Sequence, residues 1–178
     1  MNYEFLIAGF GGQGILFSGK LLSYVGMLMD KHITWLPSYG PEMRGGTANC
    51  SVIISEDPVG SPIVSHPQIL VAMNLPSLDK FEEDIKKGGM LFIDSTLIER
   101  KTARGDISAY YIPSTKLAHD NGTPTLANMI MLGYVAKITG VCSFEDLKAG
   151  VSKVVPARKV DMIEVNTKAL EIGFNYTE

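Results

Sequence analysis

The stretch that decides the fold is AGFGGQGILFSGKLL, residues 8–22. It follows the apolar run YEFLI and contains the spacing G-x-G-x-x-G, beginning at Gly9. A continuous apolar run is typical of a strand in a parallel sheet that is covered on both faces. A strand, a glycine loop and then a helix is the order in which α/β proteins build a tight turn or an anion-binding loop. The sequence therefore predicts a strand over residues 3–10 that leads through the glycines into a helix over residues 13–30.

The remainder of the chain alternates apolar runs with helical periodicity. Short apolar runs predict further strands over residues 33–36, 47–55, 68–74, 90–95 and 108–114. A 3.6-residue period predicts helices over residues 75–85, 123–140, 143–155 and 159–173. Thr123 is expected to cap the second of these helices and Gly140 to end it, and Ser143 with Asp146 comes close to a capping box for the third. The helix over 123–140 is apolar nearly all round, which predicts that it is buried in the fold or against a partner. We expect a single Rossmann-like α/β domain over residues 1–178, with a mainly parallel sheet flanked by helices and a helical C-terminal part.

Composition excludes several classes of function. The chain has 178 residues and a net charge of −3, so bulk electrostatics do not attract nucleic acid or an anionic membrane. The N-terminus shows no signal-peptide pattern, and no apolar run reaches the length of a membrane span. Two unpatterned cysteines, Cys50 and Cys142, indicate a reducing compartment and are too few to hold an iron–sulfur cluster unaided. We therefore expect a cytoplasmic protein without a metal site of its own.

The glycine loop meets only half of the requirements for a dinucleotide site. Such a site also needs an acidic residue at the end of the second strand to hold the ribose hydroxyls. Here the second strand ends in WLPS, so Pro37 and Ser38 occupy that position. Gly12 and Gln13 suit a close approach of any neighbour, whether a phosphate or another backbone. Three interpretations remain: a phosphate or anion site, glycines that serve only a tight turn, and an NAD or flavin site, against which the missing acid argues.

A second notable segment is PSYGPEMRGG, residues 37–46. Its prolines and glycines restrict a loop that carries Tyr39, Glu42 and Arg44, at the carboxyl end of the second strand, where open α/β sheets bind ligands. Arg44 is suited to bidentate binding of a phosphate or carboxylate. The alternative is an ion pair between Glu42 and Arg44 that holds the shape of the loop.

The sequence contains no complete set of catalytic groups. The order GFGGQGILFSGK lacks the lysine and hydroxyl ending of a phosphate-binding P-loop, and neither Ser18 nor Ser38 has a histidine nearby in sequence. Asn128, within the apolar helix, is interpreted as an amide bonded within the protein or as a ligand contact. We expect no catalytic residue, and a domain that lends a surface or a loop to chemistry carried out elsewhere.

Together the two loops resemble those of a known family. The segments GFGGQGI and WLPSYGPEMRGGTANCSVIIS, followed by GSPIV, AMNLPSLDKF and GGMLFIDS, are similar to the gamma subunit or gamma domain of the 2-oxoacid:ferredoxin oxidoreductases. The resemblance covers about residues 4–140 and, more loosely, the C-terminal helices. It is greatest to the 2-oxoglutarate branch, with the 2-oxoisovalerate branch next, because pyruvate-type members carry RGGQG and ERRGAP where this chain has GFGGQG and EMRGGT.

The resemblance implies a division of labour between subunits. Alpha and beta subunits hold thiamine diphosphate and magnesium, iron–sulfur clusters on partner chains pass electrons to ferredoxin, and the acyl group is transferred to coenzyme A. The expected partners are those alpha and beta subunits, with a ferredoxin-like delta subunit in some complexes. The gamma chain binds no cofactor tightly itself, supports assembly and gives access to coenzyme A. When isolated, it has surface through which it can form a homodimer. A stand-alone NAD or flavin oxidoreductase and a small-molecule binding module are the alternatives.

The residues that match the family motifs form the candidate site. They are Gly9, Gly11, Gly12, Gln13 and Gly14 in the first loop, and Ser38, Tyr39, Pro41, Glu42, Arg44, Gly45 and Gly46 in the second. Our hypothesis is that both loops face the catalytic subunits near the entry of coenzyme A, where Arg44 and the helix N-terminus favour a phosphate. The competing hypothesis is a purely architectural interface.

Overall fold

The computed structural model describes residues 2–39 and 47–177, with the side chain of Tyr39 excepted. These residues form a six-stranded sheet in the order β2-β3-β1-β4-β5-β6. The strands are β1 (Asn2–Phe10), β2 (His32–Tyr39), β3 (Thr47–Ser55), β4 (Ile69–Ala72), β5 (Met90–Asp94) and β6 (Ser108–Ile112). The helices are α1 (Ile15–Leu28), α2 (Leu75–Phe81), α3 (Ser114–Asp120), α4 (Ala127–Thr139), α5 (Phe144–Val154) and α6 (Asp161–Phe174), joined by the short 3₁₀ helices η1 (Glu82–Asp84), η2 (Pro124–Leu126) and η3 (Ala157–Lys159). The expected α/β fold is confirmed.

The sheet is mixed, and one strand accounts for this. Strands β1, β4, β5 and β6 pair in parallel, whereas β3 runs antiparallel to both β1 and β2. The reason lies in the length of the connection between β2 and β3, because a parallel pair needs a crossover of about a dozen residues or more. Residues 40–46 are too few for such a crossover. The short connection therefore makes β3 run antiparallel to β2, and β3 keeps this direction beside β1.

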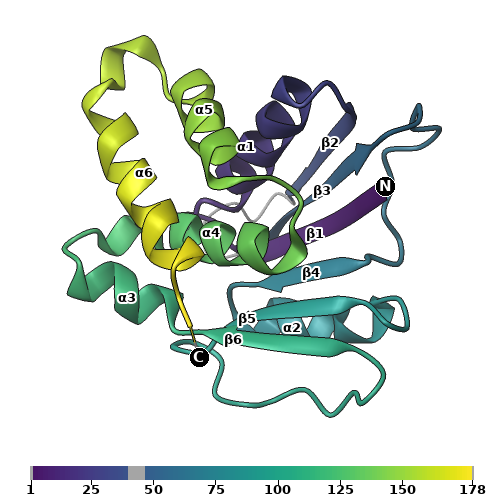
Figure 1. Cartoon of the computed structure of the whole chain (residues 1–178). Coiled ribbons are helices and arrows are strands. Elements are labelled where there is room, and N and C mark those ends of the chain that lie inside the picture. Colours follow the sequence, from purple (N-terminus) through teal and green to yellow (C-terminus); the bar gives the residue numbers. More distant parts are fainter. Residues whose placement is uncertain (1, 40–46, 178) are drawn as a thin grey trace.

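The helices lie on the two faces of the sheet (Figure 1). Helices α1, α4, α5 and α6 pack over one face, and α2 lies on the other. The centre of α4 is buried from Asn128 to Ala136, so the expected all-round burial of this helix is confirmed and occurs within the fold. No helix in the described ranges is both long and apolar enough to cross a bilayer.

Several element boundaries differ from the expectations. Strand β2 extends through Pro37 to Tyr39, which an edge strand tolerates because one side of its backbone needs no partner. Helix α3 was not expected, and it begins directly after the last strand. Thr123 does not cap the following helix as expected, since its hydroxyl donates instead to the carbonyl of Ala118. The expected caps at Ser143 and Gly140 are present.

Candidate functional site

The glycine loop joins β1 to α1 at the carboxyl edge of the parallel strands. Gly12 and Gly14 have φ angles of 97° and 72°, in the left-handed region that glycine adopts without strain. Gly14 is the N-cap of α1 and brings no side chain to cap the first turn. The N-terminal N–H groups of α1 are thus free of a capping side chain, and the helix dipole places partial positive charge there.

Gln13 holds the glycine loop against the neighbouring strand. Its Oε1 accepts a hydrogen bond of 2.6 Å from the backbone N–H of Phe10, and its Nε2 donates one of 3.0 Å to the carbonyl of Met73, which follows β4. A Cβ at Gly9 would lie 2.6 Å from the same Oε1. The side chain of Gln13 therefore fixes the loop, and Gly9 makes room for it.

Asn128 joins the loop to α4 behind it. Its Nδ2 donates to the carbonyl of Gly14 and to Oγ of Ser18, each at 3.1 Å. A Cβ at Gly14 would lie 2.5 Å from this Nδ2. The interpretation of Asn128 as an interhelix amide is confirmed, and Gly14 is required both by its φ angle and by the space that Asn128 occupies.

A cavity of about 420 Å³ opens beside this loop. Its walls come from the start of α1, from η2 and α4, from the junction between α5 and α6, and from α6 itself. Lys20, Arg158 and Lys159 lie in these walls, and none of the described side chains that line the cavity is acidic. The remainder of the lining is largely apolar, including Phe17 and Met162. A pocket with three cations and a free helix N-terminus is suited to an anionic ligand with an apolar portion.

The second predicted loop is described only in part. Ser38 is exposed, and the pairing of Tyr39 with Ala48, which in turn pairs with Gly9, brings the end of β2 to the edge of the sheet that holds the glycine loop. One strand, β3, separates them. The predictions for Pro41, Glu42, Arg44, Gly45 and Gly46 lie outside the described residues, as does the alternative of an ion pair between Glu42 and Arg44.

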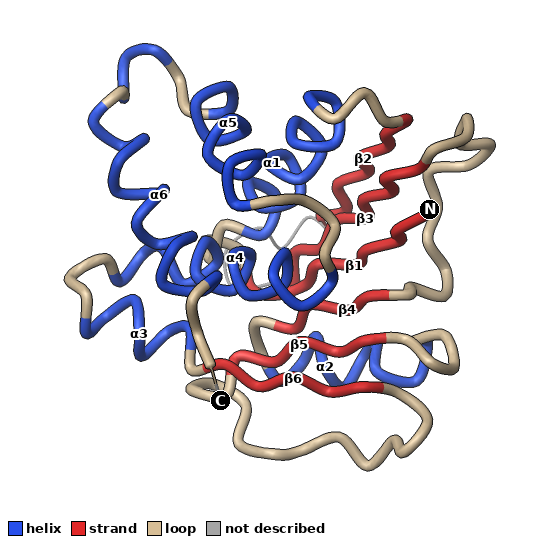
Figure 2. Tube along the Cα trace, in the orientation of Figure 1, coloured by secondary structure: helices blue, strands red, loops and turns tan. Residues whose placement is uncertain are grey.

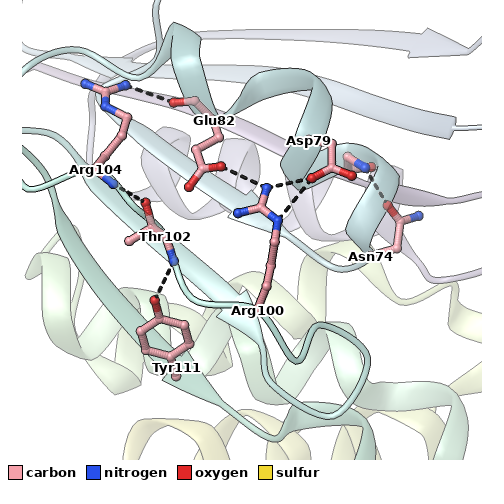
Figure 3. Close-up of polar contacts among 8 residues, drawn as sticks. Asn74, Asp79, Glu82, Arg100, Thr102, Arg104 and Tyr111 are labelled. Carbon is pink, nitrogen blue, oxygen red and sulfur yellow. Dashed lines mark hydrogen bonds and ion pairs between the residues drawn. The ribbon is translucent and has the colours of Figure 1, made fainter.

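A separate polar cluster lies around α2 (Figure 3). Arg100 binds Asp79 at 2.6 Å and Glu82 at 2.8 Å, and Arg104 donates to the backbone carbonyls of Glu82, Glu83 and Ile85. These hydrogen bonds, first to Glu82 and then to Asp79, raise the pKa of Arg100 above its usual range. The arginines are engaged in holding the connection between β5 and β6 against α2 and η1, so this cluster is structural.

Neither of the two thiols is suited to act as a nucleophile. Burial raises the pKa of Cys50 from 9.0 to about 12, although hydrogen bonds to Trp35 and Gly19 oppose the change. Burial also raises the pKa of Cys142 to about 12. The reactive thiolate form is therefore scarce at neutral pH. Cys50 is a fully buried residue of β3.

A family model described as "Pyruvate ferredoxin/flavodoxin oxidoreductase" matches residues 4–176. The chain belongs to this family. The resemblance to gamma subunits of the 2-oxoacid:ferredoxin oxidoreductases is thereby confirmed. A solved structure named as a keto/oxoacid ferredoxin oxidoreductase gamma subunit, from Geobacter sulfurreducens, is 32% identical, covers 98% of this chain and 95% of its own, and superimposes with a TM-score of 0.85.

Two kinds of curated relative differ in name and in length. Ketoisovalerate oxidoreductase subunit VorA of Methanothermobacter thermautotrophicus is 40% identical over 94% of this chain, but the match spans only 35% of VorA. 2-Oxoglutarate synthase subunit KorC of Methanocaldococcus jannaschii is 37% identical over 88% of this chain and 85% of its own length. The chain thus spans about a third of the VorA relatives and most of KorC.

The cations of the cavity were not among the predicted site residues. Lys20 falls inside the first helix, and Arg158 and Lys159 form an ordinary basic pair after Pro156. No motif spacing links Lys20 to Arg158 and Lys159, because most of the chain lies between them. The glycine loop was recognisable because its glycines are neighbours in sequence.

Proposed function

We propose that this chain is the gamma subunit of a complex that oxidatively decarboxylates 2-oxoglutarate to an acyl-CoA and passes the electrons to ferredoxin. Membership of the family supports the oxidoreductase assignment. The motifs GFGGQG and EMRGGT favour 2-oxoglutarate, as does the 37% identity to a 2-oxoglutarate synthase subunit KorC over 88% of this chain. The higher identity to VorA makes 2-oxoisovalerate the second candidate substrate. In this proposal residues 1–178 act as one gamma domain, and thiamine diphosphate, magnesium and iron–sulfur clusters are held by partner subunits.

We further propose that the cavity beside the glycine loop admits coenzyme A, and this basic cavity is the observation that carries the proposal. Coenzyme A has several phosphate charges and a pantetheine arm that is uncharged and partly apolar. The three cations and the start of α1 would bind its phosphates, and the apolar walls from Phe17 to Met162 would accept less polar portions. Coenzyme A supplies the thiol that accepts the acyl group. The gamma residues orient the cosubstrate and contribute no reacting atom.

The assignment is tested by co-expressing this chain with thiamine-binding and iron–sulfur subunits of a 2-oxoacid:ferredoxin oxidoreductase from the same organism. The purified complex is assayed for dye reduction that requires both coenzyme A and a 2-oxoacid. We expect activity with 2-oxoglutarate to exceed that with 2-oxoisovalerate. The reverse preference would make 2-oxoisovalerate the assigned substrate. A chain that purifies alone with bound NAD or flavin would overturn the assignment.

The role of the cavity is tested by Lys20→Ala and by the double variant Arg158→Ala with Lys159→Ala. Because each variant removes positive charge from the cavity, we expect the KM for coenzyme A to rise about tenfold or more, with the KM for the 2-oxoacid unchanged. Lys101→Ala, an exposed lysine of the connection between β5 and β6, makes the same charge change elsewhere and is the control. An unchanged KM for coenzyme A in both cavity variants would contradict the proposal.

Arg44→Ala distinguishes the two hypotheses for the second loop. A raised KM for coenzyme A in an intact complex supports a phosphate contact. Loss of assembly supports an architectural interface. A variant that changes neither would exclude both roles.

A further inference from the structure

The three cations of the cavity fall into two groups. Lys20 lies on α1, the helix whose N-terminus opens on the glycine loop. Arg158 and Lys159 lie on η3, in the connection between α5 and α6. Figure 2 shows these two parts of the wall apart, with the connection between α5 and α6 at the upper left and α1 nearer the middle of the molecule. The cavity therefore offers positive charge at two places.

The backbone holds the basic pair of η3 in place. The N–H of Val155 donates to the carbonyl of Val151 at the end of α5. The N–H of Lys159 donates to the carbonyl of Pro156 at 2.8 Å, and the ring of this proline restricts its φ angle, which is −60°. Arg158 and Lys159 thus project from a short, hydrogen-bonded turn. Little more than their side chains has to be ordered when an anion binds, which lowers the entropic cost of binding.

Arg158 differs from the other arginines that the structure describes. Arg100 and Arg104 each form ion pairs with carboxylates of this chain. Within residues 2–39 and 47–177, neither Arg158 nor Lys159 has such a partner. A guanidinium without a carboxylate can bind a phosphate through two N–H groups at once. The pair on η3 therefore has the chemistry of a site for a phosphate group.

Coenzyme A also carries its phosphate charge at two places. A diphosphate joins the 5′-carbon of the ribose to the pantetheine arm, and a separate phosphate monoester is attached to the 3′-carbon. A glycine loop that leads into a helix is suited to a diphosphate, because backbone N–H groups and the helix dipole act together there. An arginine–lysine pair is suited to the monoester, which carries about two negative charges at neutral pH. The two groups of cations thus match the two groups of phosphates.

We propose that Arg158 and Lys159 bind the 3′-phosphate of coenzyme A, whereas the glycine loop and Lys20 bind its diphosphate. This inference rests on the proposed function and gives it a specificity. The cavity distinguishes coenzyme A from 3′-dephospho-coenzyme A, which has the same diphosphate, pantetheine arm and thiol. Because both molecules carry the reacting thiol, the basic pair selects between them by binding alone and takes no part in acyl transfer.

The first test compares the two cosubstrates in the co-expressed complex. Because dephospho-coenzyme A cannot make the charged hydrogen bonds to the pair, we expect its KM to exceed that of coenzyme A by about tenfold or more. In the double variant Arg158→Ala with Lys159→Ala, the KM for coenzyme A alone should rise, so the ratio of the two KM values should fall below about threefold. Lys20→Ala should raise both KM values and preserve their ratio.

The matched control is the double variant Lys101→Ala with Lys153→Ala. It removes the same amount of charge from two exposed lysines that do not line the cavity, so both KM values should stay unchanged. Three results would overturn the inference and leave the proposed function intact. They are equal KM values for the two cosubstrates in the parent complex, a ratio that survives in the variant of the basic pair, and a ratio that is lost in Lys20→Ala.

The second test measures binding apart from turnover, by isothermal titration of the complex in the absence of a 2-oxoacid. The parent complex should bind coenzyme A about tenfold or more tightly than dephospho-coenzyme A, and the variant of the basic pair should bind the two with nearly equal affinity. Equal affinities in the parent complex would contradict the inference. If the parent complex neither requires coenzyme A for activity nor binds it, the proposed function fails and the inference fails with it.

Discussion

At the scale of single residues, the candidate site depends on where small and polar side chains meet. Gln13 connects the glycine loop to the segment after β4, and Asn128 connects it to α4. Removing the Gln13 amide would take away a hydrogen bond from the carbonyl of Met73, and removing the Asn128 amide would leave the carbonyl of Gly14 bonded only to Ser18. The loop is therefore held in a fixed shape before any ligand arrives, and this lowers the entropic cost of binding an anion.

The buried thiols give a prediction about chemical reactivity. Because burial raises the pKa of Cys50 and Cys142 to about 12, the thiolate fraction at pH 8 should be about a thousandfold below that of an unfolded chain. Alkylation by iodoacetamide at pH 8, followed by mass spectrometry, should be slow in the native protein and fast in urea. Equal rates in the two states would show that the thiols are not buried.

The same thiols make stability depend on alkaline pH. The pKa in the folded state lies above the unfolded value of 9.0, so the thiol contribution is complete below pH 9 and is lost as the pH rises toward 12. Urea denaturation should show an unfolding free energy that falls across this window. The fall should be smaller in Cys142→Ala, which removes one of the two groups.

At the scale of elements, the contact between α4 and α6 depends on two glycines. A Cβ at Gly173 would lie 1.7 Å from the carbonyl oxygen of Ile130, and one at Gly133 would lie 2.0 Å from that of Leu170. These neighbours are backbone atoms of the facing helix, which cannot move aside as a flexible side chain can. The two helices can lie this close only because neither position carries a side chain.

Gly173→Ala should therefore destabilise the protein. Overpacking costs about 1–3 kcal/mol or more, and the better helix propensity of alanine returns only about 1 kcal/mol. We expect a clear net loss of unfolding free energy in urea titration. Gly105→Ala, where a Cβ would meet nothing within 4 Å, is the control and should change stability by less than about 0.5 kcal/mol. A Gly173→Ala variant as stable as the parent would contradict the close helix contact.

At the scale of the whole molecule, three cations gather at one cavity on the carboxyl edge of the sheet. The chain carries a net charge of −3, yet the cavity at the carboxyl edge is lined by cations from both ends of the chain. Binding of an anion at this cavity should therefore depend on salt.

The salt dependence of the KM for coenzyme A tests the role of the cavity cations. Screening weakens attraction between exposed charges, so the KM for coenzyme A should rise between about 0.05 and 0.5 M NaCl. The rise should be smaller in Lys20→Ala, which has less charge to screen. A KM that is independent of salt would argue against binding by the cavity cations.

The sequence by itself determined the features that depend on neighbours along the chain. The alternation of apolar runs and helical periods indicated the α/β class, and the glycine spacing located the turn between β1 and α1. The capping box of Ser143 and Asp146 was recognisable because both of its partners lie within one helical turn. The two loop motifs placed the chain in its family, since each is a continuous segment.

Only the tertiary structure decided the features that join distant segments. It placed β3 between β2 and β1 in the sheet, and it brought Lys20 to the same cavity as Arg158 and Lys159. It also showed that Gly133 and Gly173 allow two helices to touch, and that the connection after β3 projects from the sheet. The physical reason is that periodicity and capping depend on bonds within a few residues, whereas strand order, helix contacts and shared cavities depend on how the whole chain packs.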